Sequence, residues 1–309
     1  MSEYGIGRRH GMHVVHDGSP QAPPLLLVHG SGCSGGFWNP VVPALAARHH
    51  VIRVDLPGCG QSPPAVSYDV PAQAGRVAAL LDDLGVRGAA VAGHSSGGYV
   101  GTAIAEARPD LVRSLALLGS GPSHGALLPQ PWALRSLTSP PFGPLLWAAA
   151  RSDAAIRRWI GAMCAAPAVV PDEVVAEVRA TTYRTLRAVL RGNTAYITER
   201  TVPERLAALR LPVLVVFGGA DPRWEPASAH QYDTVPDARV HVLPGVGHLP
   251  MAEAPGATAD LLLGFTAAPG RPAAAGQDGP GGGVGDPPGA DADRGAGPLK
   301  NGDPADAGG

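Results

Sequence analysis

The sequence predicts an α/β protein with a mostly parallel, doubly wound sheet, and three features support this. Apolar runs of strand length recur along the chain, at residues 23–30, 49–58, 88–95, 112–120, 211–219 and 238–247. Near-continuous apolar runs are typical of strands that are buried on both faces of a parallel sheet. Helical patterns lie between the runs, and such alternation predicts right-handed strand–helix–strand crossovers.

The helical stretches between the strands have apolar residues at three- and four-residue spacing. They cover residues 40–49, 70–85 and 96–110, and the last of them stops at Pro109. Proline interrupts a helix because it lacks an N–H group and clashes with the preceding turn. Residues Met12–Asp17 form a weaker candidate for an edge strand that precedes the first buried run.

The alternation stops between Gly121 and about Leu209, where no buried-strand run occurs. Helical patterns such as residues 172–190 replace it. We interpret this stretch as a helical insertion over the carboxyl ends of the strands, where open α/β sheets bind ligands. Several aromatic residues could shape an apolar pocket there, although core packing explains each equally well: Trp38, Trp132, Phe142, Trp147 and Trp159.

Composition limits the partners and the compartment. The 309 residues carry a formal net charge of −2, which gives no basic surface for nucleic acid. Cys33, Cys59 and Cys164 are too few for a disulfide framework, and we expect free thiols in a reducing compartment. The N-terminus lacks the apolar core of a signal peptide, and no run has the length of a membrane helix. We therefore expect a cytoplasmic protein without a membrane partner.

The composition changes near residue 268. Residues 268–309 are mostly Gly, Pro, Ala and Asp, and Leu299 is their one large aliphatic residue. Such a segment cannot bury enough apolar area to offset the entropy lost on ordering. We therefore predict a disordered tail.

The pattern G-x-S-x-G occurs three times, around Ser34, Ser95 and Ser123. A serine nucleophile of this kind needs a strand that runs into it and a helix that starts just after it. Ser34 lies in a glycine-rich loop, and the residues after Ser123 have two prolines and no helical period. Only Ser95 has both a strand before it and a helix after it, which makes it the candidate nucleophile.

A serine hydroxyl needs a base, and the base needs a carboxylate that orients it. Asp221 follows the strand at 211–219, and His248 follows the strand at 238–247. Because parallel strands end at one edge of the sheet, Ser95, Asp221 and His248 are expected to meet there. Glu225 could replace Asp221, and we assign His94 a packing role.

An oxyanion hole requires two N–H donors near the nucleophile. We expect one from Ser96 and the other from the loop after strand 23–30, with Ser31 as first choice and Gly32 as second. That loop lacks the Lys-Ser/Thr ending of a P-loop and the spacing of a dinucleotide site. No cofactor and no metal are therefore expected.

Five motifs in this order resemble those of α/β-hydrolase-fold serine hydrolases: HGSG (29–32), DLPGCGQS (55–62), GHSSGG (93–98), FGGADP (217–222) and GVGHLPMAEAP (245–255). The resemblance implies a Ser95–Asp221–His248 triad and a sheet of about eight strands. It also implies a core at 1–120 and 206–267 with a helical cap at 121–205.

The expected function is hydrolysis of a small-to-medium apolar ester, lactone or thioester through an acyl-enzyme on Ser95, with a small-molecule acyl substrate. One alternative is a C–C bond hydrolase of dienone or diketone substrates with the same triad. HGSG is similar to the oxyanion loop of that group, but Leu249 stands where its tryptophan is usual. Another alternative is a non-catalytic ligand-binding homologue, because fold does not imply function.

Overall fold

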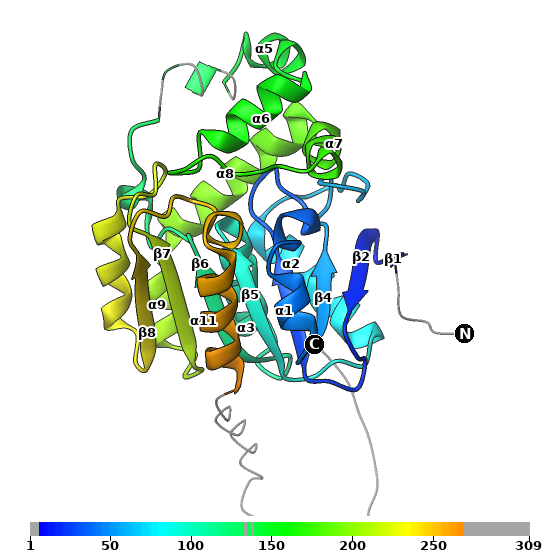
Figure 1. Ribbon diagram of the computed structural model, residues 1–309, viewed down its shortest axis with the longest axis vertical. Helices are drawn as coiled ribbons and strands as arrows, with labels where there is room; N and C mark the ends of the chain where they lie inside the picture. The colour runs from blue at the N-terminus through cyan, green and yellow to red at the C-terminus, as the bar shows by residue number, and fades with distance from the viewer. Residues whose placement is uncertain (1–5, 131, 133–134, 137–138, 268–309) are drawn as a thin grey trace, which may run out of the picture. The chain divides into compact units, whose positions relative to one another are not determined.

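The structure, a computed structural model, describes residues 6–130, 132, 135–136 and 139–267. The predicted disordered tail, residues 268–309, lies outside the described residues. The described part is built around one eight-stranded sheet with the strand order β1-β2-β4-β3-β5-β6-β7-β8 (Figure 1). The predicted α/β fold and the expected number of strands are confirmed.

The strands are mostly parallel. Only the pairs β1–β2 and β2–β4 are antiparallel, and the remaining neighbours from β4 to β8 run parallel. The bounds are β1 Ile6–Arg9, β2 Met12–Asp17, β3 Pro24–Val28, β4 His50–Val54, β5 Ala89–His94, β6 Val112–Leu118, β7 Val213–Gly218 and β8 Ala238–Leu243. The expected edge strand Met12–Asp17 is present as β2, whereas β1 was not predicted, and β8 ends before the predicted residue 247.

Helices cover both faces of the sheet (Figure 1). Against one face lie α2 Val70–Asp83, α3 Ser96–Ala107, α9 Val202–Ala207 and the 3₁₀ helix η3 Pro226–Thr234. Against the other lie the 3₁₀ helix η1 Gly35–Trp38, α1 Val42–Ala46, α10 Pro250–Glu253 and α11 Pro255–Ala267. Alternate residues of β3 serve the two faces: Leu26 and Val28 belong to the first core, Leu25 and Leu27 to the second. Burial on both faces explains the unbroken apolar runs of the sequence.

Between β6 and β7 the described residues contain no named strand. Besides α9, they form the 3₁₀ helix η2 His124–Ala126 and the helices α5 Gly143–Ala149, α6 Asp153–Gly161, α7 Asp172–Ala180 and α8 Tyr183–Glu199. We call α5 to α8 with their connections the β6–β7 insertion. In Figure 1 these helices stand above the upper ends of the strands.

The helical pattern at 172–190 is not one helix, as the sequence suggested, but two. Thr181 and Thr182 adopt extended backbone conformations between α7 and α8, and the Thr182 hydroxyl accepts a hydrogen bond from the Thr185 N–H at 3.1 Å. A threonine cap of this kind starts a new helix. None of the described helices combines the length and the apolar character needed to cross a membrane.

Candidate active site

Ser95 stands at a sharp turn between β5 and α3. Its backbone has φ 51° and ψ −119°, a conformation that costs a non-glycine residue about 1–3 kcal/mol. The surrounding glycines leave no room for a side chain. A Cβ on Gly93 would lie 2.4 Å from the Gly97 carbonyl carbon, and a Cβ on Gly97 would lie 2.2 Å from the Val28 oxygen. This close packing of strand against helix produces the strand–turn–helix geometry that a serine nucleophile requires.

The other two serines of the G-x-S-x-G pattern have different surroundings. Ser34 is fully buried and donates a hydrogen bond to the Glu177 carboxylate at 2.5 Å. Ser123 donates to the Gln231 side-chain oxygen at 3.1 Å and precedes only a short 3₁₀ helix. Of these three serines, Ser95 is therefore the one that lies at a turn between a strand and a helix.

Asp221 and His248 meet at the carboxyl edge of the sheet, as the sequence predicted. The Asp221 Oδ2 atom lies 2.8 Å from His248 Nδ1, and the two residues are 3% and 2% exposed. Asp221 follows the end of β7, and His248 follows β8. Glu225, the alternative carboxylate, is exposed. A carboxylate at Nδ1 leaves the other ring nitrogen of His248 as the one that can accept a proton.

The Asp221 carboxylate is stabilised in its ionised form. Its second oxygen, Oδ1, accepts hydrogen bonds from the backbone N–H groups of Arg223 at 2.7 Å and Trp224 at 3.2 Å. Burial works to raise the pKa of Asp221, but the His248 imidazole and these two N–H donors outweigh it, and the pKa lies below its ordinary value. The carboxylate therefore stays charged beside the imidazole.

Two side chains hold the backbone around His248. Glu253 accepts the N–H of Gly247 at 2.9 Å and that of Leu249 at 3.0 Å, on either side of the histidine. The His94 ring is paired through Nε2 with the His248 carbonyl oxygen at 2.9 Å, so its role extends beyond packing. Burial lowers the pKa of His94 to about 3, which keeps this ring neutral, and Nε2–H is the donor. Both residues were within predicted motifs, but neither was assigned this role.

Ser31 and Ser96, the two predicted oxyanion donors, are brought together. Ser96 is the first residue of α3, where backbone N–H groups lack helical partners. The Ser31 and Ser96 hydroxyl oxygens are 2.9 Å apart, and Asn193 of α8 donates to the Ser31 hydroxyl at 2.9 Å. Gly32, the second choice, has φ 71° and faces Leu186. Asn193 was not indicated by the sequence, because it lies 162 residues from its partner.

A cavity of about 390 Å³ opens beside these residues, and we call it the Ser95 cavity. Residues from two regions line this cavity. Ser31, Ser95 and His248 belong to the sheet edge, and Trp159, Met163 and Leu186 belong to the β6–β7 insertion. The insertion also contacts the site directly, since the His248 N–H donates to the Met163 carbonyl oxygen at 2.8 Å. The cavity therefore lies between the sheet edge and the insertion.

The aromatic candidates differ in where they lie. Trp38 is fully buried in the core, and Phe142 is 69% exposed and lines none of the described cavities. Trp159 lines the Ser95 cavity. Trp132 and Trp147 line a neighbouring cavity, considered below.

The surroundings of the three cysteines disfavour the thiolate form. Cys33 lines the Ser95 cavity, but burial raises the pKa of its thiol far above the ordinary value. Cys33, Cys59 and Cys164 are all free thiols. Among residues 6–130, 132, 135–136 and 139–267, no group of three His, Cys, Asp or Glu side chains could hold a metal ion.

Comparison with known proteins agrees with this geometry. Residues 25–261 match the alpha/beta hydrolase family. A putative carbamate hydrolase RutD of Azorhizobium caulinodans is 32% identical over 78% of this chain and 90% of its own length. The pimeloyl-[acyl-carrier protein] methyl ester esterase of Aeromonas hydrophila is 42% identical over a shorter stretch, 33% of this chain and 39% of that protein.

The fold also matches a solved structure of the N-acyl homoserine lactonase AidH with N-butanoyl homoserine. The TM-score is 0.70 at 23% identity, over 86% of this chain and 96% of that one. At this identity the likeness concerns the fold alone. The family match covers most of the chain and includes the sheet edge that carries Ser95, Asp221 and His248. The chain therefore belongs to the alpha/beta hydrolase family and is a hydrolase.

Proposed function

We propose that the protein is a serine hydrolase that cleaves small-to-medium, mostly apolar esters or closely related acyl compounds. His248 takes the proton of the Ser95 hydroxyl as Oγ attacks the carbonyl carbon of the substrate. Asp221 orients the imidazole and stabilises its protonated form. The N–H groups of Ser31 and Ser96 stabilise the oxyanion of the tetrahedral intermediate.

The first intermediate then collapses to an acyl-enzyme. His248 gives its proton to the leaving group, and the bond between the carbonyl carbon and that group breaks. Water next donates a proton to His248 and attacks the acyl carbon, forming a second tetrahedral intermediate. Its collapse returns the proton from His248 to Ser95 Oγ and releases the acid. No cofactor takes part in this scheme.

The observation that carries the proposal is the 2.8 Å contact between the buried Asp221 and His248, together with the cavity that His248 and Ser95 line. A buried carboxylate–imidazole pair beside a serine at a strand-to-helix turn is the arrangement that activates a hydroxyl near neutral pH. The Ser95 backbone strain adds to this, because strained conformations concentrate at functional sites.

The cavity supports the substrate class. About 390 Å³ suits a small organic molecule, and Trp159, Met163 and Leu186 give it apolar walls. We propose that the β6–β7 insertion acts as a cap over this cavity. The names of the two relatives add a carbamate and a methyl ester to the esters, lactones and thioesters worth testing.

The test compares two serines that share the same sequence pattern. A fluorophosphonate probe should label the wild type and Ser123→Ala but not Ser95→Ala. Turnover of p-nitrophenyl butyrate should fall by a factor of about 10⁴ or more in Ser95→Ala, with the circular dichroism spectrum unchanged. Undiminished turnover in folded Ser95→Ala protein would refute the proposal.

A further inference from the structure

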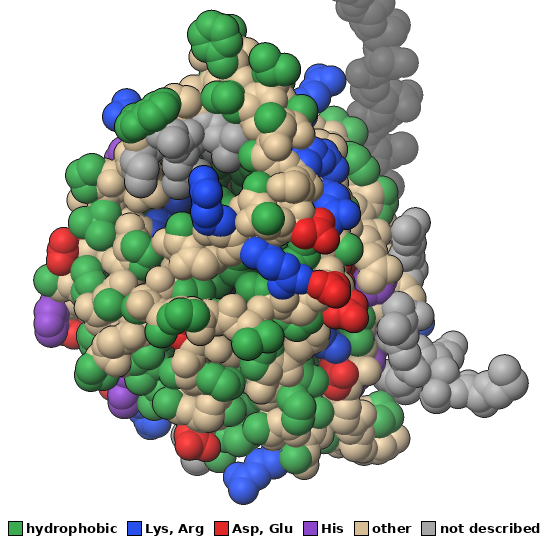
Figure 2. All heavy atoms as spheres, turned by 45° about the horizontal axis from the view of Figure 1, so that its top comes forward, with side chains coloured by type: hydrophobic (Ala, Val, Ile, Leu, Met, Phe, Trp, Pro, Cys, Tyr) green, Lys and Arg blue, Asp and Glu red, His purple; other side chains and the backbone are tan. Residues whose placement is uncertain are grey.

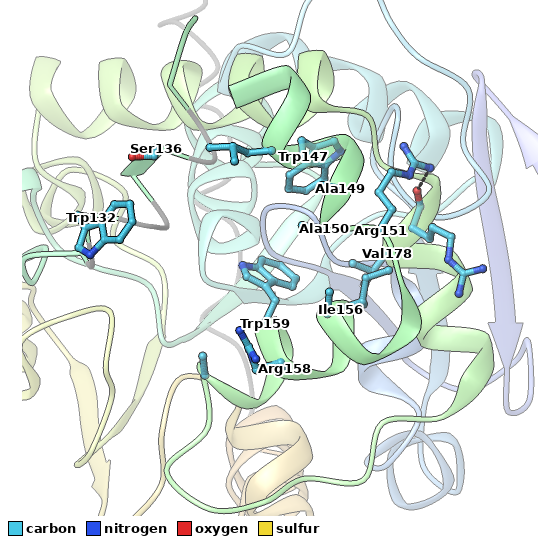
Figure 3. A pocket seen from close by; sticks show the side chains of 14 residues that line it. Trp132, Ser136, Trp147, Ala149, Ala150, Arg151, Ile156, Arg158, Trp159 and Val178 are labelled. Atoms are coloured by element: carbon cyan, nitrogen blue, oxygen red, sulfur yellow. Dashed lines mark hydrogen bonds between the residues drawn. The ribbon is translucent and has the colours of Figure 1, made fainter. Parts of the chain in front are cut away.

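A second cavity of about 540 Å³ lies within the β6–β7 insertion, and we call it the outer cavity (Figure 3). Its walls come from α5, α6 and α7, with Trp147, Ile156 and Val178 as apolar lining. In Figure 3 the Trp159 indole stands near the middle of the view, with Trp147 above it and Arg158 below. A cavity of this size and lining can hold an organic group.

The outer cavity adjoins the Ser95 cavity. Trp159 of α6 and Ala162, the residue that follows this helix, line both, so the two spaces meet at the carboxyl-terminal end of α6. A substrate bound at Ser95 therefore has a second apolar space within reach.

Arginines line both cavities. Arg151, Arg158 and Arg179 line the outer cavity, and Arg135 and Arg223 line the Ser95 cavity. Among the described residues, no Asp or Glu lines either cavity. Figure 2 shows basic side chains around the hollow on this face of the molecule. In a chain whose net charge is −2, these arginines give the two cavities a cationic lining.

Arg158 differs from its neighbours in the outer cavity. Arg179 forms an ion pair with Asp153, and Arg151 donates to the Arg179 carbonyl oxygen. Within the described part of the chain, Arg158 has no acidic group within ion-pair distance and no side-chain hydrogen bond. An arginine guanidinium without a partner binds carboxylate or phosphate oxygens well, because its planar fork matches them.

We propose that the outer cavity binds the far end of an elongated acyl substrate that terminates in an anion, with Arg158 as the residue that recognises the charge. This inference rests on the proposed function. The ester carbonyl lies at Ser95, the apolar chain passes Trp159 and Ala162, and the terminal carboxylate or phosphate meets the Arg158 guanidinium. The apolar walls stabilise the chain by removing it from water.

The experiment uses pairs of p-nitrophenyl esters that differ only in the terminal group. Octanoate ends in a methyl group, suberate in a carboxylate and 7-phosphonoheptanoate in a phosphonate. The wild type should have a higher kcat/KM for one or both anionic esters than for octanoate. Arg158→Met, which keeps an apolar stem and removes the charge, should lower kcat/KM for the preferred anionic ester about tenfold and leave octanoate within about twofold.

Arg184→Met is the matched control, because Arg184 is exposed on α8 and lines neither cavity. The preference for the anionic esters should persist in this variant. Ala162→Trp, which narrows the junction of the cavities, should lower kcat/KM for octanoate more than for butyrate. Preference for suberate over phosphonate, or the reverse, identifies the anion.

Absence of any anionic preference in the wild type, or an equal fall for octanoate and suberate in Arg158→Met, would overturn the inference. The proposed function would survive both outcomes as long as butyrate hydrolysis still depends on Ser95. Butyrate hydrolysis that persists in Ser95→Ala would instead remove the proposed function itself.

Discussion

The carboxyl edge of the sheet and the β6–β7 insertion are held in place in different ways. At the sheet edge, backbone packs against backbone, and a Cβ on Gly97 would lie only 2.2 Å from the Val28 oxygen. In the insertion, side chains make the connections: α6 and α7 are joined by ion pairs such as Arg179–Asp153, and Leu145 of α5 is 73% exposed. Exposed ion pairs contribute little to stability, usually less than about 1 kcal/mol each.

In the proposed mechanism, this difference separates the chemistry from the selection of the substrate. The proposed proton transfer between Ser95 and His248 requires groups held to within a fraction of an ångström, and the close-packed sheet edge suits that requirement. The insertion supplies cavity walls, where a change of one side chain alters which molecules fit. We therefore expect substitutions at the sheet edge to reduce turnover of all substrates, and substitutions in the insertion to act mainly on their relative rates.

Among substitutions at the sheet edge, we expect Asp221→Asn to have the largest effect on turnover. The amide keeps the size of the carboxylate but cannot stabilise a protonated His248, and it favours the wrong tautomer of the ring. We expect kcat to fall by about 10³–10⁴-fold for every substrate. Glu225→Gln, four residues along the chain at an exposed position, is the control and should retain full activity. If Glu225→Gln lost activity and Asp221→Asn retained it, Glu225 would be the orienting carboxylate.

A pair of glycine substitutions compares the packing of the two regions. Gly97→Ala places a methyl group against the Val28 carbonyl and should lower the free energy of unfolding by about 3 kcal/mol. Gly161→Ala, at the end of α6 with open space around it, should raise it by up to about 1 kcal/mol because alanine favours helix. Thermal and urea denaturation measure both. Equal destabilisation by the two changes would contradict the proposed difference in packing.

The same contrast explains what could be predicted from the sequence. Ser95, Asp221 and His248 each follow a strand, so strand order alone was enough to place Asp221 beside His248. The short β1 was missed because Gly7 and the arginines Arg8 and Arg9 give it no apolar pattern. Asn193 and Arg158 could not be found, because their contacts depend on how the insertion folds over the edge. No local sequence signal records a contact between residues 162 positions apart.

Asn193 is one of the points at which the two regions meet, and its replacement should have the smallest effect. It is 7% exposed, and its amide donates to the Ser31 hydroxyl, which in turn contacts Ser96. We infer that Asn193 positions the loop that carries the Ser31 N–H. Asn193→Leu should lower kcat about tenfold with little change in KM, in line with the loss of one neutral hydrogen bond.

Asn193→Asp provides the decisive comparison for this positioning role. It replaces the amide donor with a carboxylate that can only accept from the Ser31 hydroxyl. It also adds a negative charge close to the developing oxyanion, so its kcat should fall below that of Asn193→Leu. Thr198→Leu, at an exposed position of the same helix, should leave kcat unchanged. A purely structural role for Asn193 would instead lower the melting temperature of both variants and leave kcat of the folded protein unaltered. A fall in kcat at unchanged KM would show that the insertion, beyond its proposed role in selecting substrates, also helps to set the geometry of the sheet edge.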